Sequence, residues 1–196
     1  MRKDTNALLL FSLLLSLLDG THVAGIIGGR TVGVAKNARL YCAKAYDYYT
    51  AASTSRVISK LADVVERIKV TQNPSVINLS ISQPPSDAMD EAVCILPVNY
   101  GYPPDAKCVP QVQMAINNCI PVIVAAGNEG INANYKSPAR VFEAITIAAT
   151  TIDDTWSIDS NYGDVIKFLA PGEFIPSLGH LNNNAMAYTS GTSMAT

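Results

Sequence analysis

One serine near the end of the chain stands in a setting that suits nucleophilic chemistry. Ser193 lies in the stretch Gly191-Thr192-Ser193-Met194-Ala195, where a glycine turn could open a helix. Free backbone N–H groups and the helix dipole stabilise negative charge at a helix N-terminus. The oxyanion that forms when a serine attacks a carbonyl needs such stabilisation. The same stretch could also form a plain helix cap, so alone it leaves both interpretations open.

A second candidate is Asn128, which follows the apolar run Pro121–Ala126 and Gly127. The run predicts a buried strand, and an amide at the carboxyl end of such a strand can point into a site and hold an oxyanion. The alternative is a turn residue ahead of Gly130.

In order and spacing, these two stretches and Gly20-Thr21-His22-Val23-Ala24-Gly25 resemble the subtilisin-like serine peptidases (subtilases), most closely their proteinase K-like branch. The resemblance runs from about Gly20 to Thr196 and also takes in residues 29–36, 76–80, 160–163 and 170–172. It implies a serine endopeptidase with a Ser nucleophile, a His general base, an Asp that orients the His, and an Asn in the oxyanion hole. Ser193 matches the nucleophile and Asn128 the oxyanion donor.

The activating partners of that serine depart from the family pattern. The family motif is His-Gly-Thr-His with the first His as base, but this chain has Asp19 there and only the second histidine, His22. A carboxylate with a pKa of about 3.9 is a weak base for a serine proton at neutral pH. His180 has no family match, and Asp4-Thr5-Asn6 only faintly resembles the family's Asp-Thr-Gly. We therefore expect the chain as given to be inactive; the alternative function is a non-catalytic peptide-binding relative.

The resemblance also implies two walls around the substrate residue on the acyl side of the cleaved bond (P1). They are Ser80, Ile81 and Ser82 on one side and Ala125, Ala126 and Gly127 on the other. Small side chains there predict room for a sizeable P1 side chain, with the peptide added as an extra strand. The family commonly has glycine where Ser82 stands.

No metal or other cofactor is expected. The calcium-binding aspartate of proteinase K-like enzymes is replaced by Lys167, whose ammonium would repel the ion. A nucleotide site in the loop Gly25–Gly33 is a remote alternative, since its glycines do not follow the GxGxxG spacing.

Composition limits the classes of binding partner and the cellular compartments that fit this sequence. A net charge of −2 over 196 residues gives no basic surface for nucleic acid. Peptides or proteins are the expected partners of a monomer without stable membrane association. Cys94 and Cys108 flank a Pro- and Tyr-rich loop, so a disulfide fits a secreted protein, and buried free thiols fit equally well.

The first residues differ from the rest. Residues 1–19 form a hydrophobic leader with a short basic start, and residues 20–196 a partial subtilase domain. The apolar run 7–18 is too short to span a bilayer and suits a signal-peptide core. We expect secretion; the alternatives are an anchor through residues 7–18 or a leader foreign to the domain.

The remaining patterns predict an α/β fold with a mostly parallel sheet and helices on both faces. Val57, Leu61, Val64, Val65 and Ile68 recur at helical spacing behind Ser53 or Ser55 as cap. Strands are expected at 38–45 (buried on one or both faces), 76–81, 121–126, 144–149 and 165–169, a long loop at 83–107 and a helix at 110–118. Compared with the family, we expect the N-terminal strand and the C-terminal helices to be lacking.

Overall fold

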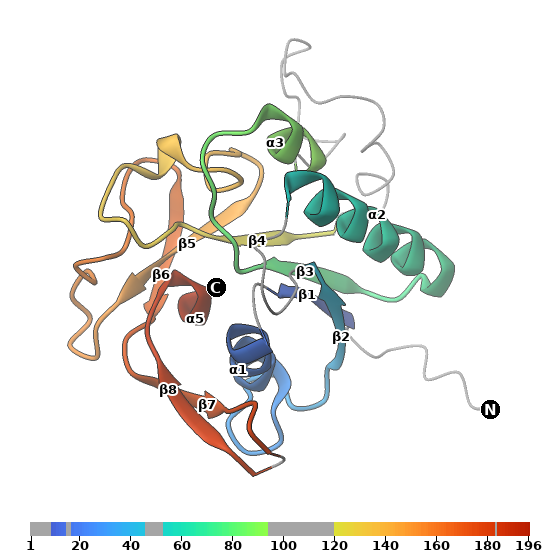
Figure 1. The fold of residues 1–196 in the computed structure, drawn as a ribbon, viewed down its shortest axis with the longest axis horizontal. Coiled ribbons are helices and arrows are strands. Elements are labelled where there is room, and N and C mark those ends of the chain that lie inside the picture. The colour runs from blue at the N-terminus through green and yellow to red at the C-terminus, as the bar shows by residue number, and fades with distance from the viewer. Residues whose placement is uncertain (1–8, 15–16, 46–52, 94–119, 183) are drawn as a thin grey trace.

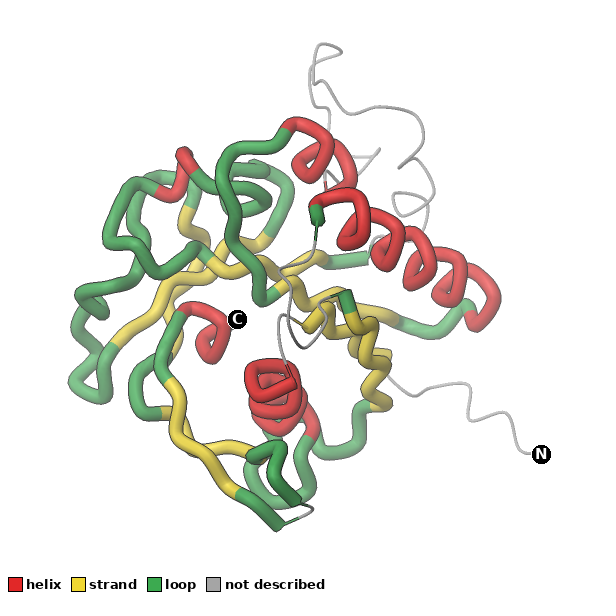
Figure 2. The backbone as a smooth tube through the Cα atoms, in the orientation of Figure 1, coloured by secondary structure: helices red, strands yellow, loops and turns green. Residues whose placement is uncertain are grey.

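A six-stranded parallel sheet forms the centre of the computed structural model, which describes residues 9–14, 17–45, 53–93, 120–182 and 184–196 (Figures 1 and 2). The strands are ordered β2-β1-β3-β4-β5-β6. Their bounds are β1 (Leu9–Leu14), β2 (Arg39–Lys44), β3 (Ser75–Leu79), β4 (Val122–Ala125), β5 (Ile145–Thr150) and β6 (Ile166–Pro171).

Helices cover both faces of this sheet. α2 (Thr54–Thr71) and α3 (Asp87–Val93) lie on one face, and α1 (Leu17–Gly28) and the short α5 (Thr192–Ala195) lie on the other (Figure 1). An antiparallel hairpin of β7 (Ile175–Leu178) and β8 (Met186–Thr189) packs beside α1, and a 3₁₀ turn, η2, spans Ala133–Tyr135. The predicted fold class is confirmed.

α2 shows how local sequence starts and ends a helix. The Ser53 hydroxyl accepts a hydrogen bond from the Arg56 N–H at 3.3 Å, which satisfies one of the free N–H groups at the helix start. Gln72 takes a left-handed conformation, and its N–H closes the last turn on the Ile68 carbonyl. Of the two caps considered, Ser53 is the one used.

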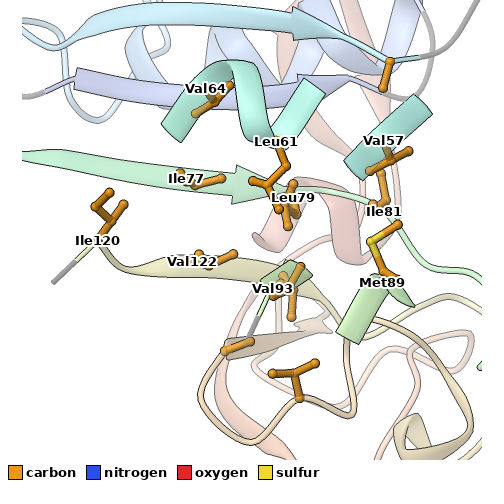
Figure 3. Close-up of a cluster of buried hydrophobic side chains, with 14 of the residues drawn as sticks. Val57, Leu61, Val64, Ile77, Leu79, Ile81, Met89, Val93, Ile120 and Val122 are labelled. Carbon is orange, nitrogen blue, oxygen red and sulfur yellow. The ribbon is translucent and has the colours of Figure 1, made fainter. Parts of the chain in front are cut away.

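The main core lies between α2, α3 and the central strands (Figure 3). The four buried side chains of α2 belong to the same cluster as buried residues of β3 and β4, and β4 is apolar throughout, as is usual for a strand covered on both faces. Each large side chain buried here contributes about 1.5–3 kcal/mol. The cluster comprises Ala45, Val57, Leu61, Val64, Ile68, Ile77, Leu79, Ile81, Met89, Val93, Ile120, Val122, Val124, Val141 and Ala144.

The expectation of no N-terminal strand needs a correction. Leu9–Leu14, assigned from the sequence to a leader, is strand β1 and pairs in parallel with both β2 and β3. The reason is physical: a short apolar run meets the requirements of a buried parallel strand as well as those of a signal-peptide core. No helix in the part of the chain that the structure describes is both long and apolar enough to cross a membrane.

The structure also refines other local expectations. β2 is an edge strand whose Tyr41 and Ala43 pack against the core while its other face is more exposed, so of the two alternatives, burial on one or both faces, the first describes it better. The loop predicted at 83–107 contains α3 in its first part, which ends at Val93. The helix predicted at 110–118 and the two cysteines Cys94 and Cys108 lie outside the described residues.

Candidate functional site

Ser193 lies in the second position of α5, beside the segment that follows β3. Its hydroxyl donates a hydrogen bond to the Ser80 carbonyl over 3.4 Å. In return the single O–H of Ser80 is shared between two acceptors, the Ser193 carbonyl at 3.2 Å and the Asn78 side-chain oxygen at 2.8 Å. Residues far apart in the sequence are thus joined at the carboxyl end of β3, where an open α/β sheet carries its sites.

Asn128 holds the start of α5 in place. Its Oδ1 accepts hydrogen bonds from the Thr192 N–H and from the Thr192 hydroxyl, both at 2.8 Å. The same hydroxyl accepts from the Gly127 N–H at 3.1 Å. Because Oδ1 is occupied and the residue is exposed, Nδ2 is the part of this amide that can face a ligand. Gly191 at φ 143° leaves that nitrogen room, since a Cβ there would lie 3.1 Å from it.

A fully buried asparagine, Asn161, fixes the loop that carries Asn128. Its Oδ1 accepts from the Glu129 N–H (3.1 Å) and the Ile131 N–H (2.9 Å). Its Nδ2 donates to the Ala126 carbonyl and to the Glu129 carboxylate, both at 2.8 Å. One side chain therefore satisfies four polar groups of a loop that has no regular secondary structure of its own.

Glu129 is the charged member of this loop. Partial burial raises the pKa of its carboxyl group, but hydrogen bonds from Lys136 and Asn161, together with the Lys136 charge, outweigh burial and lower the pKa below its ordinary value of 4.5. The charged form is therefore the one that the folded loop favours.

A pH dependence follows from the lowered pKa. A carboxyl group with a depressed folded-state pKa contributes stability that is present above its ordinary value, here 4.5, and lost as the pH falls through the folded value. We expect Glu129→Gln to unfold more easily than wild type at pH 6–7, with the difference shrinking below about pH 4.5. Urea unfolding of both proteins across pH 3–7 measures the difference in their free energies of unfolding. A difference that stays constant with pH would contradict the prediction.

His22 is fully buried within α1, and its side chain hydrogen-bonds to the hairpin formed by β7 and β8. Its Nε2 lies 2.9 Å from the Ile175 carbonyl and 3.1 Å from the Ala187 carbonyl. Both partners only accept, so Nε2 carries the hydrogen and donates to them. The His22 carbonyl in turn accepts from the Ser177 hydroxyl at 2.7 Å. These contacts tie α1 to β7 and β8, and the proton-carrying nitrogen is not directed at the Ser193 hydroxyl.

Asp19 lies half-buried in the first turn of α1, where the helix dipole favours a negative charge. α1 packs beside α5 (Figure 1), so the helix that carries Asp19 and the Ser193 helix are neighbours in the fold. Asp4-Thr5-Asn6 lies outside the described residues. His180 is half-buried in the loop between β7 and β8.

The predicted substrate-binding residues lie at and just beyond the carboxyl ends of β3 and β4, which are adjacent parallel strands. The Ile81 side chain belongs to the core cluster, and Ala125 and Ala126 are also buried, so these three could meet a ligand only through their backbone. Ser82 is half-buried and points at Gly127 from across the gap between the segments. Their role in substrate binding stays a prediction.

The remaining site expectations concern metals and nucleotides. The Lys167 ammonium lies 4.0 Å from the centre of the Phe142 ring, a cation–π contact. In the described ranges no group of three or more His, Cys, Asp or Glu side chains is placed to hold a metal ion. Gly25 serves packing, because a Cβ there would lie 2.3 Å from the Ser177 hydroxyl of β7.

The fold is that of an α/β protein in which an asparagine just beyond a strand end, Asn128, holds Thr192, the neighbour of Ser193 in a short helix. The comparisons identify the family: residues 20–196 match the model of the subtilase family, and the chain belongs to it.

Relatives share this assignment. The chain is 41% identical over 180 residues to an extracellular serine proteinase of Thermus sp. (strain Rt41A) and 39% identical over 180 residues to subtilisin-like protease 2 of Trichophyton equinum. Both alignments cover 90% of this chain and 38% of the relative. A crystal structure of a cold-adapted subtilisin-like serine proteinase superposes with a TM-score of 0.79 at 29% identity, covering 98% of this chain and 72% of that one. The chain thus spans well under half the length of these curated relatives.

Sequence reasoning missed three residues of the site. Thr192 and Asn161 lie in stretches that support the resemblance, and Glu129 follows Asn128 directly. The sequence nevertheless predicts no functional role for any of the three. It also contains no signal for the burial of Asn161, because Asn161 stands in the polar stretch Asp159–Asp164, where a turn residue is the ordinary interpretation.

Proposed function

We propose that this chain carries the nucleophile and the substrate-binding segments of a serine endopeptidase that acts on extended peptides, but lacks the base that activates the nucleophile. One observation carries the proposal. Ser193, Ser80 and Asn128 are brought together, and the Ser193 hydroxyl donates to a backbone carbonyl rather than to an imidazole.

In the complete reaction, the serine oxygen attacks the peptide carbonyl carbon, and its proton passes to a base and then to the leaving amine. Ser193 is the proposed nucleophile, and the Asn128 Nδ2 is the proposed donor to the oxyanion. The Ser80 carbonyl can accept a hydrogen bond but cannot take up the proton. Asp19, at the family's histidine position, is too weak a base at neutral pH, so we propose that attack is arrested at its first proton transfer.

The substrate is proposed to bind as an extended strand along residues 80–82 and 125–127. The same segments support the alternative function, a peptide-binding protein that has lost catalysis, because they are intact while the base is replaced. No cofactor is proposed. Since the Thermus relative is named an extracellular proteinase, we propose that this protein is also secreted. A monomer stays our expectation for its oligomeric state.

Fluorophosphonate labelling of Ser193 tests the missing base. We expect wild type to label at the slow rate of an unactivated serine and Asp19→His to label at least about tenfold faster, because an imidazole beside the serine acts as general base. Intact-protein mass spectrometry measures the label, and Ser193→Ala must abolish it in both backgrounds.

Peptide binding and labelling together separate the two functions. Binding of a labelled peptide by wild type without rapid labelling is expected of both the arrested peptidase and the non-catalytic protein, and a gain of labelling in Asp19→His then supports the arrested peptidase. Rapid labelling of wild type would mean that another group activates Ser193, and it would overturn the proposed loss of the base.

A further inference from the structure

One buried hydroxyl at the proposed substrate site is without a hydrogen-bond partner among the described residues. It belongs to Ser82, and its Oγ is shielded from solvent. By contrast, the neighbouring hydroxyl of Ser80 makes two hydrogen bonds. A buried hydroxyl without a partner costs about 1–3 kcal/mol, so an unsatisfied one at a site points to a ligand group that completes it.

The position of this hydroxyl is set by the two segments that flank it. A Cβ on Gly127 would lie 2.6 Å from Ser82 Oγ, which places the hydroxyl against the α-carbon of the opposite segment. The other polar atoms around that α-carbon, Asn161 Nδ2 and Glu129 Oε2, are hydrogen-bonded to each other. The Ser82 hydroxyl is therefore the member of this group that is left to bind something else.

We propose that Ser82 is a specificity-determining residue that selects P1 side chains able to form a hydrogen bond, such as Asn or Gln, over apolar aromatic ones. The inference rests on the proposed function, in which residues 80–82 and 125–127 flank the P1 side chain. It revises the expectation of a roomy P1 pocket, since the side chain at position 82 takes up space that a glycine would leave open.

Two effects set the preference. A carbonyl or amide group on P1 pairs with the Ser82 hydroxyl, whereas an apolar group of equal size leaves that hydroxyl buried and unpaired. A phenyl ring, in addition, must compete for the space beside Gly127 that the serine side chain occupies.

Fluorescence anisotropy with the whole chain tests the proposal. The probes are fluorescein-labelled tetrapeptide amides, Ala-Ala-Ala-Xaa, whose last residue is Asn, Leu or Phe; Asn and Leu are nearly equal in shape. We expect wild type to bind the Asn peptide about fivefold more tightly than the Leu peptide, which is the contribution of one hydrogen bond. Ser82→Ala should bind the two equally, and Ser82→Gly should bind the Phe peptide about tenfold more tightly than wild type does.

Urea unfolding of the variant shows whether a change in peptide binding is caused indirectly, by a change in the stability of the fold. Ser82→Ala removes an unsatisfied buried hydroxyl, so it should unfold at the same urea concentration as wild type or a higher one. An Asn preference that persists in Ser82→Ala would overturn the inference alone. Failure of wild type and both variants to bind any of the peptides would overturn the proposed function and this inference with it.

Discussion

Replacing Asn161 by alanine lowers the free energy of unfolding by about 3 kcal/mol, because two N–H groups and one carbonyl of the loop lose their partner in a buried place. The Glu129 carboxylate loses a donor as well. Since this loop carries Asn128, which in turn holds the start of α5, we expect peptide binding to be lost even where the variant is folded. Urea unfolding and anisotropy measure the two effects.

Asn134→Ala is the matched control. Asn134 follows the same loop in the sequence but is exposed, and its side chain donates to the exposed Asp164 carboxylate. Removing such a surface contact changes stability by no more than about 0.5 kcal/mol. Equal losses in the two variants would contradict the account of Asn161 as the residue that organises the loop.

Replacing His22 by leucine is the second change with a large expected effect. It removes two hydrogen bonds from the fully buried His22 side chain to the Ile175 and Ala187 carbonyls, and we expect a loss of about 2–3 kcal/mol in unfolding free energy. Labelling of Ser193 per folded molecule should not change, since His22 holds the hairpin and does not activate the serine. Urea unfolding and fluorophosphonate labelling together separate the two roles.

His180→Ala provides the comparison, since it removes the chain's other histidine from a loop. We expect a change below about 1 kcal/mol. If His22→Leu instead left stability unchanged and slowed labelling, His22 would be the base, and its assignment to the hairpin would be wrong.

The sheet could be predicted because each central strand has a recognisable sequence pattern. β3, β4 and β5 are short apolar runs bounded by turn residues, and α2 shows the 3.6-residue period with a serine cap. What could not be predicted was the role of Leu9–Leu14, since an apolar run of that length satisfies a sheet and a secretion signal alike. Only its pairing with β2 and β3 distinguishes the two, and pairing is a long-range property.

The site was predictable as a set of residues but not as a network. The motif around Ser193 and the strand end at Asn128 gave the candidates, and the structure brings them to one place. The residues that hold them there, Asn161 and Thr192, act through hydrogen bonds that cross 30 or more positions of the sequence. The spacing of residues along the chain does not reveal such long-range hydrogen bonds.

Hydrolysis of an internally quenched fluorogenic peptide by the purified chain, measured beside Ser193→Ala at pH 8, tests the missing activation of Ser193 most directly. The two proteins should release fluorescence at the same background rate, because the wild-type hydroxyl has a backbone carbonyl and no imidazole as its hydrogen-bond acceptor. Cleavage by wild type that disappears in Ser193→Ala would contradict the account.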